Sequence, residues 1–524
     1  MSDPRPDLFR RLEDPSPWDV LIIGGGATGL GSAVEAASRG YRTLLVEQVD
    51  FAKATSSRAT KLAHGGVRYL QQGNIALVYS ALRERGLMIR NAPHLVRPLS
   101  FIIPAYRWWE KAFYGFGLEI YELMAAAGRL SLGHSHVLSR AETIRRLPTV
   151  KQKDLRGGVS YHDGQFDDTR LAVALLRTFE DQGGTALNYT TATGFVKSGG
   201  KISGVRLRDE ETGREYEVKA RAVLNATGIF TDQVRRLDDA GVSEMLSVSQ
   251  GTHIVLDRSF LPSRDALMIP KTEDGRVLFG VPWHGRVVVG TTDLGVPKPV
   301  LEPRAQEGEV EFLLHHASKY LDRPVGRGDV LSIFSGLRPL VKAGEGQSTK
   351  QLSRDHTIVT SGAGLVTITG GKWTTYRHMG EDAVNHLEEA AGFAARKSVT
   401  AGLHLHGWME PAPGAAPDIE HVYGSDAPAI AALAHTEPGL EGLLHARLPY
   451  RRAEVVWAAR HEHARTVEDI LARRTRALLL DARASGEAAP EVARLLAAEL
   501  GRDEAWQKNQ VEAYQKLVQG YVLH

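Results

Sequence analysis

Residues 18–47 carry the pattern that most constrains the fold of this chain. The apolar run Asp19-Val-Leu-Ile-Ile23 leads into a glycine-rich turn, and an alanine-rich segment follows that closes at Gly40. A second apolar run, Thr43-Leu-Leu-Val-Glu47, comes next. Short apolar runs on either side of a segment with helical periodicity predict a strand, a helix and a second strand. Such a βαβ unit belongs to a parallel sheet covered by helices, so we predict an α/β protein with a Rossmann-like start.

The turn after the first predicted strand has the sequence Gly24-Gly-Gly26-Ala-Thr-Gly29. Its glycines let the backbone approach a pyrophosphate at the helix N-terminus, and Glu47 can accept a hydrogen bond from a ribose hydroxyl. Taken alone, this pattern is also compatible with a plain tight turn. Its place between strand and helix, with the acidic residue in register, favours dinucleotide binding by Gly24, Gly26, Gly29 and Glu47.

The composition narrows the possible chemistry. The chain has no cysteine, which excludes disulfides, thiolate metal sites, dithiol relays and a cysteinyl link to a cofactor. We therefore expect redox chemistry from a bound cofactor and no bound metal. Lys and Arg (64) nearly balance Asp and Glu (62), so no global field suggests nucleic-acid binding. Without an apolar leader or about 18 uninterrupted apolar residues, we expect a cytoplasmic protein that does not span a membrane.

The chain divides by composition into three parts. We predict interleaved dinucleotide-binding and substrate domains over residues 17–395, with the antiparallel-β-rich substrate region mostly at 80–200 and 230–335. Residues 396–418 contain a segment rich in Pro, Gly and Ala and are predicted to be a linker. Residues 419–524 have helical periodicity and almost no strand signal, which predicts a helical C-terminal domain.

A second apolar strand, Val223-Leu-Asn-Ala-Thr-Gly228, also ends in a glycine turn. A strand followed by a turn needs no ligand, so this segment alone leaves the function open. In flavoproteins with a dinucleotide domain of this kind, such a turn lies near the cofactor. Only together with the motifs described next does this segment predict that Ala226 and Gly228 contact the cofactor.

Five further motifs follow one another along the chain. They are Thr55-Ser-Ser-Arg-Ala-Thr-Lys-Leu-Ala-His-Gly-Gly-Val-Arg-Tyr69, Gln250-Gly-Thr-His253, Pro282-Trp283 with Gly290-Thr-Thr-Asp293, Phe334-Ser-Gly-Leu-Arg-Pro339 and Gly370-Gly-Lys-Trp-Thr-Thr-Tyr-Arg377. With them, the chain resembles the FAD-dependent glycerol-3-phosphate dehydrogenase family within the D-amino-acid-oxidase-like flavoproteins. The resemblance runs from about residue 17 to the C-terminal region, where Glu462 to Arg474 resembles the family's terminal domain. Ile229-Phe230 departs from it, because a Pro-Trp pair is common there.

The resemblance implies non-covalent FAD and a set of residues around it. The residues implied to contact the flavin side are Thr55, Ser56, Ser57, Lys61, His64 and Gly65. Ala192 is implied to lie near the adenine. The residues implied to line the isoalloxazine pocket are Gly336, Leu337, Lys372, Trp373 and Thr374. Those implied to face the substrate are Arg68, Tyr69, His253, Arg338, Arg354 and Lys372.

These residue types suit the implied chemistry. A phosphate dianion needs bidentate guanidinium donors, which Arg338 and Arg354 can supply. In glycerol 3-phosphate, a hydride leaves C2 only as the C2 hydroxyl loses its proton, so a base is needed. His253 is the expected base. Lys372 is expected to stabilise charge on reduced flavin. A single arginine or histidine is more often structural, so each role depends on the resemblance.

The expected reaction is the oxidation of sn-glycerol 3-phosphate to dihydroxyacetone phosphate, with hydride transfer to flavin and electrons passed to a membrane quinone. An oxidase that uses O2 is an open alternative, since no short motif separates the two acceptors. An amine or amino-acid oxidase is less favoured, because the substrate-side cations exceed what one carboxylate needs. A flavin-bearing binding protein without turnover is the alternative from another class.

Residues 107–124 carry an aromatic stripe in which Trp109, Phe113, Phe116, Ile120 and Leu123 recur at spacings of four and three. This spacing places them on one helix face. The stripe could pack on the core or on a second subunit of a homodimer. We expect instead an interfacial helix that holds the protein peripherally at the inner face of the cell membrane.

Overall fold

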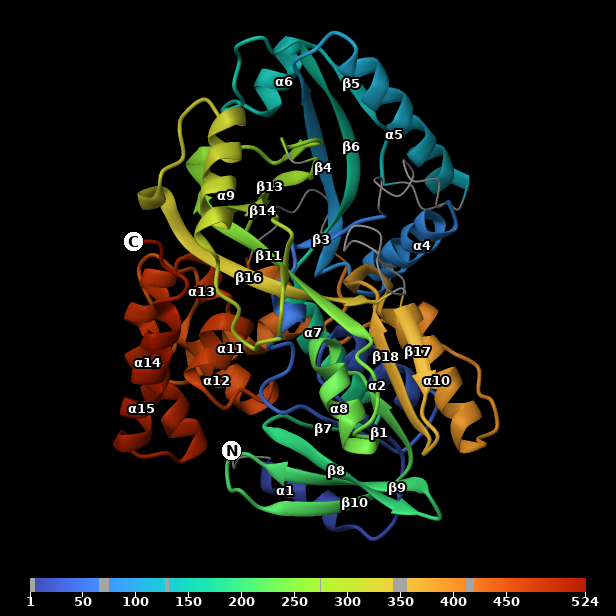
Figure 1. Cartoon of the computed structure of the whole chain (residues 1–524). Helices are drawn as coiled ribbons and strands as arrows, with labels where there is room; N and C mark the ends of the chain where they lie inside the picture. Colours follow the sequence, from blue (N-terminus) through green and yellow to red (C-terminus); the bar gives the residue numbers. More distant parts are fainter. Residues whose placement is uncertain (1–4, 66–74, 128–131, 274, 343–355, 411–418) are drawn as a thin grey trace.

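The computed structural model describes residues 5–65, 75–127, 132–273, 275–342, 356–410 and 419–524 (Figure 1). They form two β-sheets joined end to end, with a layer of helices from the C-terminal part of the chain alongside them. Among these residues, no helix combines the length and the apolarity needed to cross a bilayer.

The first sheet has eight strands and contains the predicted βαβ unit. Its main path runs β17-β18-β10-β1-β2-β7, and the strands from β18 to β7 are parallel to one another. The strands are β1 Trp18–Ile23, β2 Thr43–Val46, β7 Thr185–Leu187, β8 Thr190–Ser198, β9 Lys201–Asp209, β10 Glu215–Asn225, β17 His356–Thr360 and β18 Leu365–Gly370. Helices α2 Ala27–Ser38, α7 Asp168–Asp181 and α10 Tyr376–Ala391 pack with it. Glycines let α2 and α10 pack closely, since a Cβ at Gly380 would lie 2.7 Å from the backbone of Gly31.

The second sheet has ten strands and follows the order β15-β11-β14-β13-β12-β4-β6-β3, with β16 beside β11 and β5 beside β6. All its pairings are antiparallel except β12 with β4. The strands are β3 Leu62–Ala63, β4 Val96–Ala105, β5 His136–Leu138, β6 Gly157–Phe166, β11 Leu246–Asp257, β12 Ala266–Ile269, β13 Leu278–Trp283, β14 Arg286–Gly290, β15 Leu294–Val296 and β16 Val330–Val341. The predicted antiparallel-β-rich part of the architecture is therefore confirmed.

Residues 419–524 are helical, apart from one isolated bridge between Leu443 and Arg451. The elements are η8 Ile419–Asp426, α11 Ala427–Thr436, α12 Arg452–His461, the π-helix η9 Asp469–Arg474, α13 Ala477–Leu480, α14 Ala482–Leu500 and α15 Glu504–Val518. Their apolar faces share one core with Val255, Trp283 and Phe334 of the second sheet, opposite α9 Glu307–Tyr320. This confirms the predicted α/β architecture with a helical C-terminal part.

Helix α5, Glu110–Ala127, lies on the outer end of the second sheet and contains most of the predicted aromatic stripe (Figure 1). It runs unbroken through two glycines. Trp109, Phe113 and Phe116 of the stripe are 39%, 56% and 69% exposed, so they do not pack in the core of this chain. The neighbouring Trp108 is 80% exposed. The side chains of Ile120 and Leu123 lie outside the described part.

The remaining elements are helices, most of them short. They are α1 Arg5–Arg10, η1 Arg11–Glu13, η2 Thr55–Ser57, α4 Ile75–Asn91, α6 Arg140–Arg146, η3 Gly228–Phe230, α8 Thr231–Asp238, η4 Arg258–Phe260, η5 Arg327–Asp329, η6 Trp373–Thr375 and η7 Thr400–Gly402.

Candidate active site

The glycine turn after β1 lies where β1, β10 and α2 meet. Gly24 has φ +110°, and a Cβ there would lie 2.6 Å from the carbonyl oxygen of Ala226, at the end of β10. A Cβ at Gly29 would overlap the carbonyl oxygen of Gly24. Ala27 opens α2 and donates its N–H to Ser56 Oγ at 2.9 Å. Only glycine permits this packing, which leaves the helix N-terminus accessible to an anionic group.

Glu47 is fixed at the end of β2 by the backbone. Its two carboxylate oxygens accept from the N–H groups of Gly25 at 2.7 Å and Val49 at 3.1 Å. Burial raises the pKa of this carboxyl above its usual value. The side chain is thus held at the position predicted for a ribose contact.

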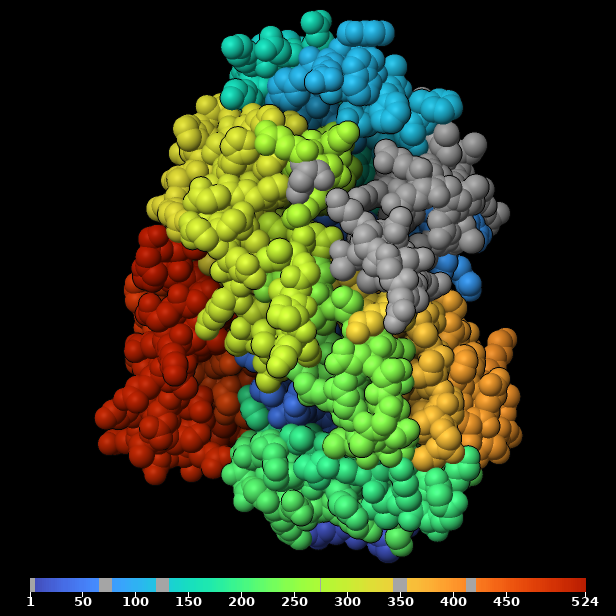
Figure 2. Space-filling model, in the orientation of Figure 1, coloured from blue at the N-terminus to red at the C-terminus, as the bar shows by residue number. Residues whose placement is uncertain are grey.

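A cavity of about 320 Å³ extends from Glu47 and Ala192 past the glycine turn to Lys372 and Trp373. In the space-filling view, residues of the N-terminal part (blue) lie at the floor of a recess between the C-terminal helices (red) and segments from the middle of the chain (green) (Figure 2). The predicted cofactor residues that line the cavity are Gly24, Gly26, Glu47, Thr55, Ser56, Ala192, Ala226, Gly228, Lys372 and Trp373. A helix N-terminus, a fixed acid and an elongated cavity fit a dinucleotide such as FAD.

The other predicted cofactor residues do not line the cavity, although Leu337 among them contacts Thr55, which does. Thr55 Oγ1 donates to the carbonyl of Leu337 at 2.6 Å, and Trp373 Nε1 donates to that of Ser56 at 2.9 Å. Thr374 Oγ1 is 3.5 Å from the carbonyl oxygen of His64. The remaining members of this group are Gly29, Ser57, Lys61, Gly65 and Gly336.

Gly336 and Lys61 show how this second group acts. A Cβ at Gly336 would lie 2.9 Å from Cβ of Arg58, so β16 lies directly against the segment after η2. Lys61 is fully buried, and its ammonium donates to Asp168 at 2.6 Å and to the carbonyl of Ser57 at 3.0 Å. Lys61 therefore fixes the chain around Ser57 to Asp168 and does not line the cavity.

His253 is buried on β11. Its ring stacks on Phe334 at 4.8 Å, and its Nε2 lies 2.9 Å from Thr60 Oγ1. Among the described residues, its Nδ1 has no hydrogen-bond partner. Burial, followed by the charges of Arg338 and Lys61, lowers the pKa of this imidazole well below its usual value. A neutral imidazole at neutral pH can accept a proton.

Arg338 lies on β16, on the same face as His253 and opposite Ser249. Its Nη2 donates to Thr291 Oγ1 and to the carbonyl of Thr292, both at 3.2 Å. Its Nη1 is 3.6 Å from Asp293, which also accepts from the Ser249 hydroxyl. The guanidinium is thus held by these contacts close enough for its charge to act on His253, with part of its surface accessible.

Three predicted substrate residues, Arg68, Tyr69 and Arg354, lie outside the described residues. The structure adds contacts that the sequence did not single out. Thr60 lies inside a quoted motif, but only the fold places it on His253. Asp168 begins α7, where an acidic residue normally suggests no more than helix capping.

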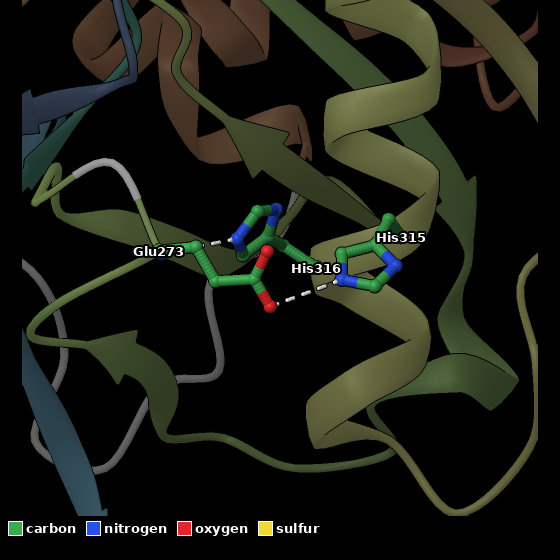
Figure 3. A group of neighbouring side chains, drawn as sticks. All are labelled: Glu273, His315 and His316. Atoms are coloured by element: carbon green, nitrogen blue, oxygen red, sulfur yellow. Dashed lines mark hydrogen bonds and ion pairs between the residues drawn. The ribbon is translucent and has the colours of Figure 1, made fainter.

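One group of three side chains among the described residues could hold a metal ion: Glu273, His315 and His316 (Figure 3). The Glu273 carboxylate already accepts from Lys319 Nζ at 2.9 Å. His316 Nε2 accepts from the backbone N–H of Glu273 at 3.4 Å, while its Nδ1 lies 2.8 Å from the Phe312 carbonyl oxygen. These contacts attach the β12–β13 connection to α9, which accounts for the group without a metal.

Comparison with known proteins gives matches over nearly the whole chain. Residues 19–377 match the family described as FAD dependent oxidoreductase, and residues 380–507 match the C-terminal domain of alpha-glycerophosphate oxidase. Glycerol-3-phosphate dehydrogenase SDP6, mitochondrial, from Arabidopsis thaliana is 40% identical, over 96% of this chain and 86% of that protein. The mitochondrial glycerol-3-phosphate dehydrogenase of Bos taurus is 38% identical, over 97% and 74%.

A solved structure is similar over its full length. The glycerol-3-phosphate dehydrogenase from Bacillus halodurans, complexed with FAD, has a TM-score of 0.81 and 27% identity. The match covers 99% of this chain and 98% of that one.

Proposed function

The chain belongs to the FAD-dependent glycerol-3-phosphate dehydrogenase family, and from this premise we propose that it oxidises sn-glycerol 3-phosphate to dihydroxyacetone phosphate and delivers the electrons to a membrane quinone. The observation that carries the proposal is the pairing of a buried neutral imidazole with a guanidinium on one sheet face. His253 and Arg338 lie together there, beside the loop that borders the cavity. A secondary alcohol that carries a phosphate needs both groups.

The cavity residues would hold FAD non-covalently. The turn at Gly24 and Gly26 would receive the pyrophosphate, Glu47 a ribose hydroxyl, and Lys372 and Trp373 the flavin end. When bound, FAD supplies the acceptor for the hydride that leaves C2 of the substrate. We assign Lys372 the stabilisation of negative charge at that end of the cavity.

Arg338 would bind the substrate phosphate, with Arg68, Tyr69 and Arg354 as further predicted contacts. His253 would take the proton from the C2 hydroxyl. The charge of Arg338 lowers the pKa of His253, so a phosphate dianion paired with Arg338 should raise that pKa again. Substrate binding would thereby strengthen the base at the moment it is needed.

The quinone and the membrane are proposed from the surface of α5. Trp108, Phe113 and Phe116 are exposed aromatic side chains in or just before α5, and Arg107 and Lys111 are close to them in sequence. Amphipathic aromatic side chains favour the interface of a bilayer, and basic side chains favour anionic headgroups. We place this surface on the inner face of the cell membrane. A homodimer contact through the same surface is the competing assignment.

The second candidate function is a glycerol-3-phosphate oxidase that passes its electrons to O2. It is favoured by one finding, the match of residues 380–507 to the C-terminal domain of alpha-glycerophosphate oxidase. Steady-state turnover with glycerol 3-phosphate in air, with and without a soluble quinone analogue, separates the two. We expect quinone reduction with little peroxide. One peroxide formed per substrate oxidised, with no quinone reduction, would establish the oxidase instead.

A further inference from the structure

Three arginines in the C-terminal helical part are buried. Arg473 and Arg474 end the π-helix η9, and Arg476 follows in the left-handed region with φ +65°. Each is no more than 2% exposed, and the buried run 477–480 comes directly afterwards. Buried cations require anionic or carbonyl partners, and short π-helical segments often occur at functional sites.

The first partner is Asp50, a fully buried carboxylate just after Glu47 in sequence. Arg474 binds it through two parallel hydrogen bonds, at 2.7 Å and 2.9 Å, and Arg473 also donates to it. Burial alone would raise the pKa of Asp50, but the charges of Arg474 and Arg473 hold it well below its usual value. The carboxylate is therefore charged and fixed by the C-terminal part.

The second partner is Asp168, which is also fully buried. Arg476 donates through one nitrogen to Asp168 at 2.9 Å and to the carbonyl of Ser57 at 2.8 Å. The other oxygen of Asp168 accepts from Lys61 at 2.6 Å and from the backbone N–H of Ala59 at 3.0 Å. Burial, then the charge of Arg476, lowers the pKa of Lys61 to about 8.

Asp50 begins residues 50–61, which we name the flavin-side loop, and Asp168 binds the other end of this loop at Ala59 and Lys61. Thr55 and Ser56 in its middle line the cavity, and Thr60 near its end contacts His253. The loop thus connects the cofactor cavity to the assigned base. Both of its ends are held by arginines more than 400 residues away along the chain.

We propose that Arg474 and Arg476 are positioning residues that hold the flavin-side loop in its FAD-binding conformation, and that Arg476 also keeps Thr60 against His253. The part that concerns His253 rests on the proposed function. Neither arginine lines the cavity, so both act through the loop and not by contact with cofactor or substrate. The C-terminal part then contributes to the active site as well as to stability.

The test compares Arg474→Met, Arg476→Met and Arg476→Lys with Arg460→Met. Arg460 also binds two carboxylates, Glu437 and Glu499, but both lie in the C-terminal part. Three readouts are measured: FAD dissociation by fluorescence, amide hydrogen exchange across residues 50–61, and the pH dependence of kcat/KM for glycerol 3-phosphate.

Arg474→Met and Arg476→Met should each weaken FAD binding by about tenfold or more and speed amide hydrogen exchange in the flavin-side loop. In Arg476→Met, water reaching His253 should raise its pKa, so the acidic limb of kcat/KM should move to higher pH by about half a unit or more. Arg474→Met should leave this limb in place. Arg460→Met should lower the melting temperature with no effect on the other readouts.

The proposal is overturned if Arg476→Met matches Arg460→Met in FAD affinity and loop exchange. If Arg476→Met does not fold, Arg476→Lys decides, because it keeps the charge but loses the planar donor group. It should fold and still speed loop exchange, and wild-type exchange in that variant would also overturn the proposal. Failure of the proposed function is distinguishable, because wild-type protein would then not turn over glycerol 3-phosphate while the differences in FAD affinity and loop exchange would persist.

Discussion

Replacing Arg338 by alanine should reduce kcat/KM for glycerol 3-phosphate at least about a hundredfold while FAD remains bound. A guanidinium that binds a phosphate makes about two charge-assisted hydrogen bonds, each contributing about 1.5–3 kcal/mol. Their sum, about 3–6 kcal/mol, corresponds to a loss of about 10² to 10⁴, since about 1.4 kcal/mol is tenfold. The Arg338 side chain is 33% exposed, and screening by water favours the lower end of this range.

The assay is dye reduction under saturating acceptor, with glycerol 3-phosphate and glycerol as separate substrates. The preference of the wild-type protein for glycerol 3-phosphate should shrink in the variant, because only the phosphate loses a partner. Arg327→Ala is the matched control, because the Arg327 side chain is 35% exposed, close to the value for Arg338, and forms ion pairs with Glu307 and Glu311. A variant within about threefold of wild type, or an equal loss with both substrates, would refute the phosphate assignment and make Arg338 structural.

Three further predictions follow from the site and the surface. His253→Asn should remove one ionisation from the acidic limb of kcat/KM, because the rate falls as a base becomes protonated at low pH; an unchanged profile with full activity would move the role elsewhere. The double variant Phe113→Glu with Phe116→Glu should abolish co-sedimentation with liposomes and slow the reduction of long-tailed quinones, but leave turnover with a soluble dye nearly unchanged. Loss of folding or of turnover with the dye would contradict the assignment of α5 to lipid. Denaturation should release the flavin from the yellow protein, and flavin retained by the precipitate would contradict non-covalent binding.

The local parts of the fold and the cavity were predictable from the sequence. The turn from Gly24 to Gly29 is specified by residues a few positions apart, because each glycine answers a steric need within one βαβ unit. The position of Glu47 was predictable for the same reason, because Glu47 comes at the end of the second strand of the same βαβ unit. Short β-rich runs likewise predicted a mostly β region, which corresponds to the second sheet.

The parts that depend on long-range packing could not be predicted in this way. Lys61 lies in a motif that suggested direct flavin contact, yet its ammonium is buried on Asp168, 107 positions away. The contacts of Arg474 with Asp50 and Arg476 with Asp168 join residues 424 and 308 positions apart. A partial signal existed, since closely spaced arginines beside the run Ala477-Leu-Leu-Leu480 need buried partners, but nothing local identifies those partners.

The most direct test of the account is an anaerobic titration of the flavin-loaded protein. Glycerol 3-phosphate should bleach the flavin absorbance, while glycerol at the same concentration should leave it nearly unchanged. Addition of a quinone analogue to one half of the bleached sample should restore the colour rapidly, and addition of O2 to the other half should restore it slowly. Equal bleaching by glycerol would contradict the phosphate site, rapid recovery with O2 alone would contradict the quinone, and no bleaching by glycerol 3-phosphate would contradict the proposed reaction itself.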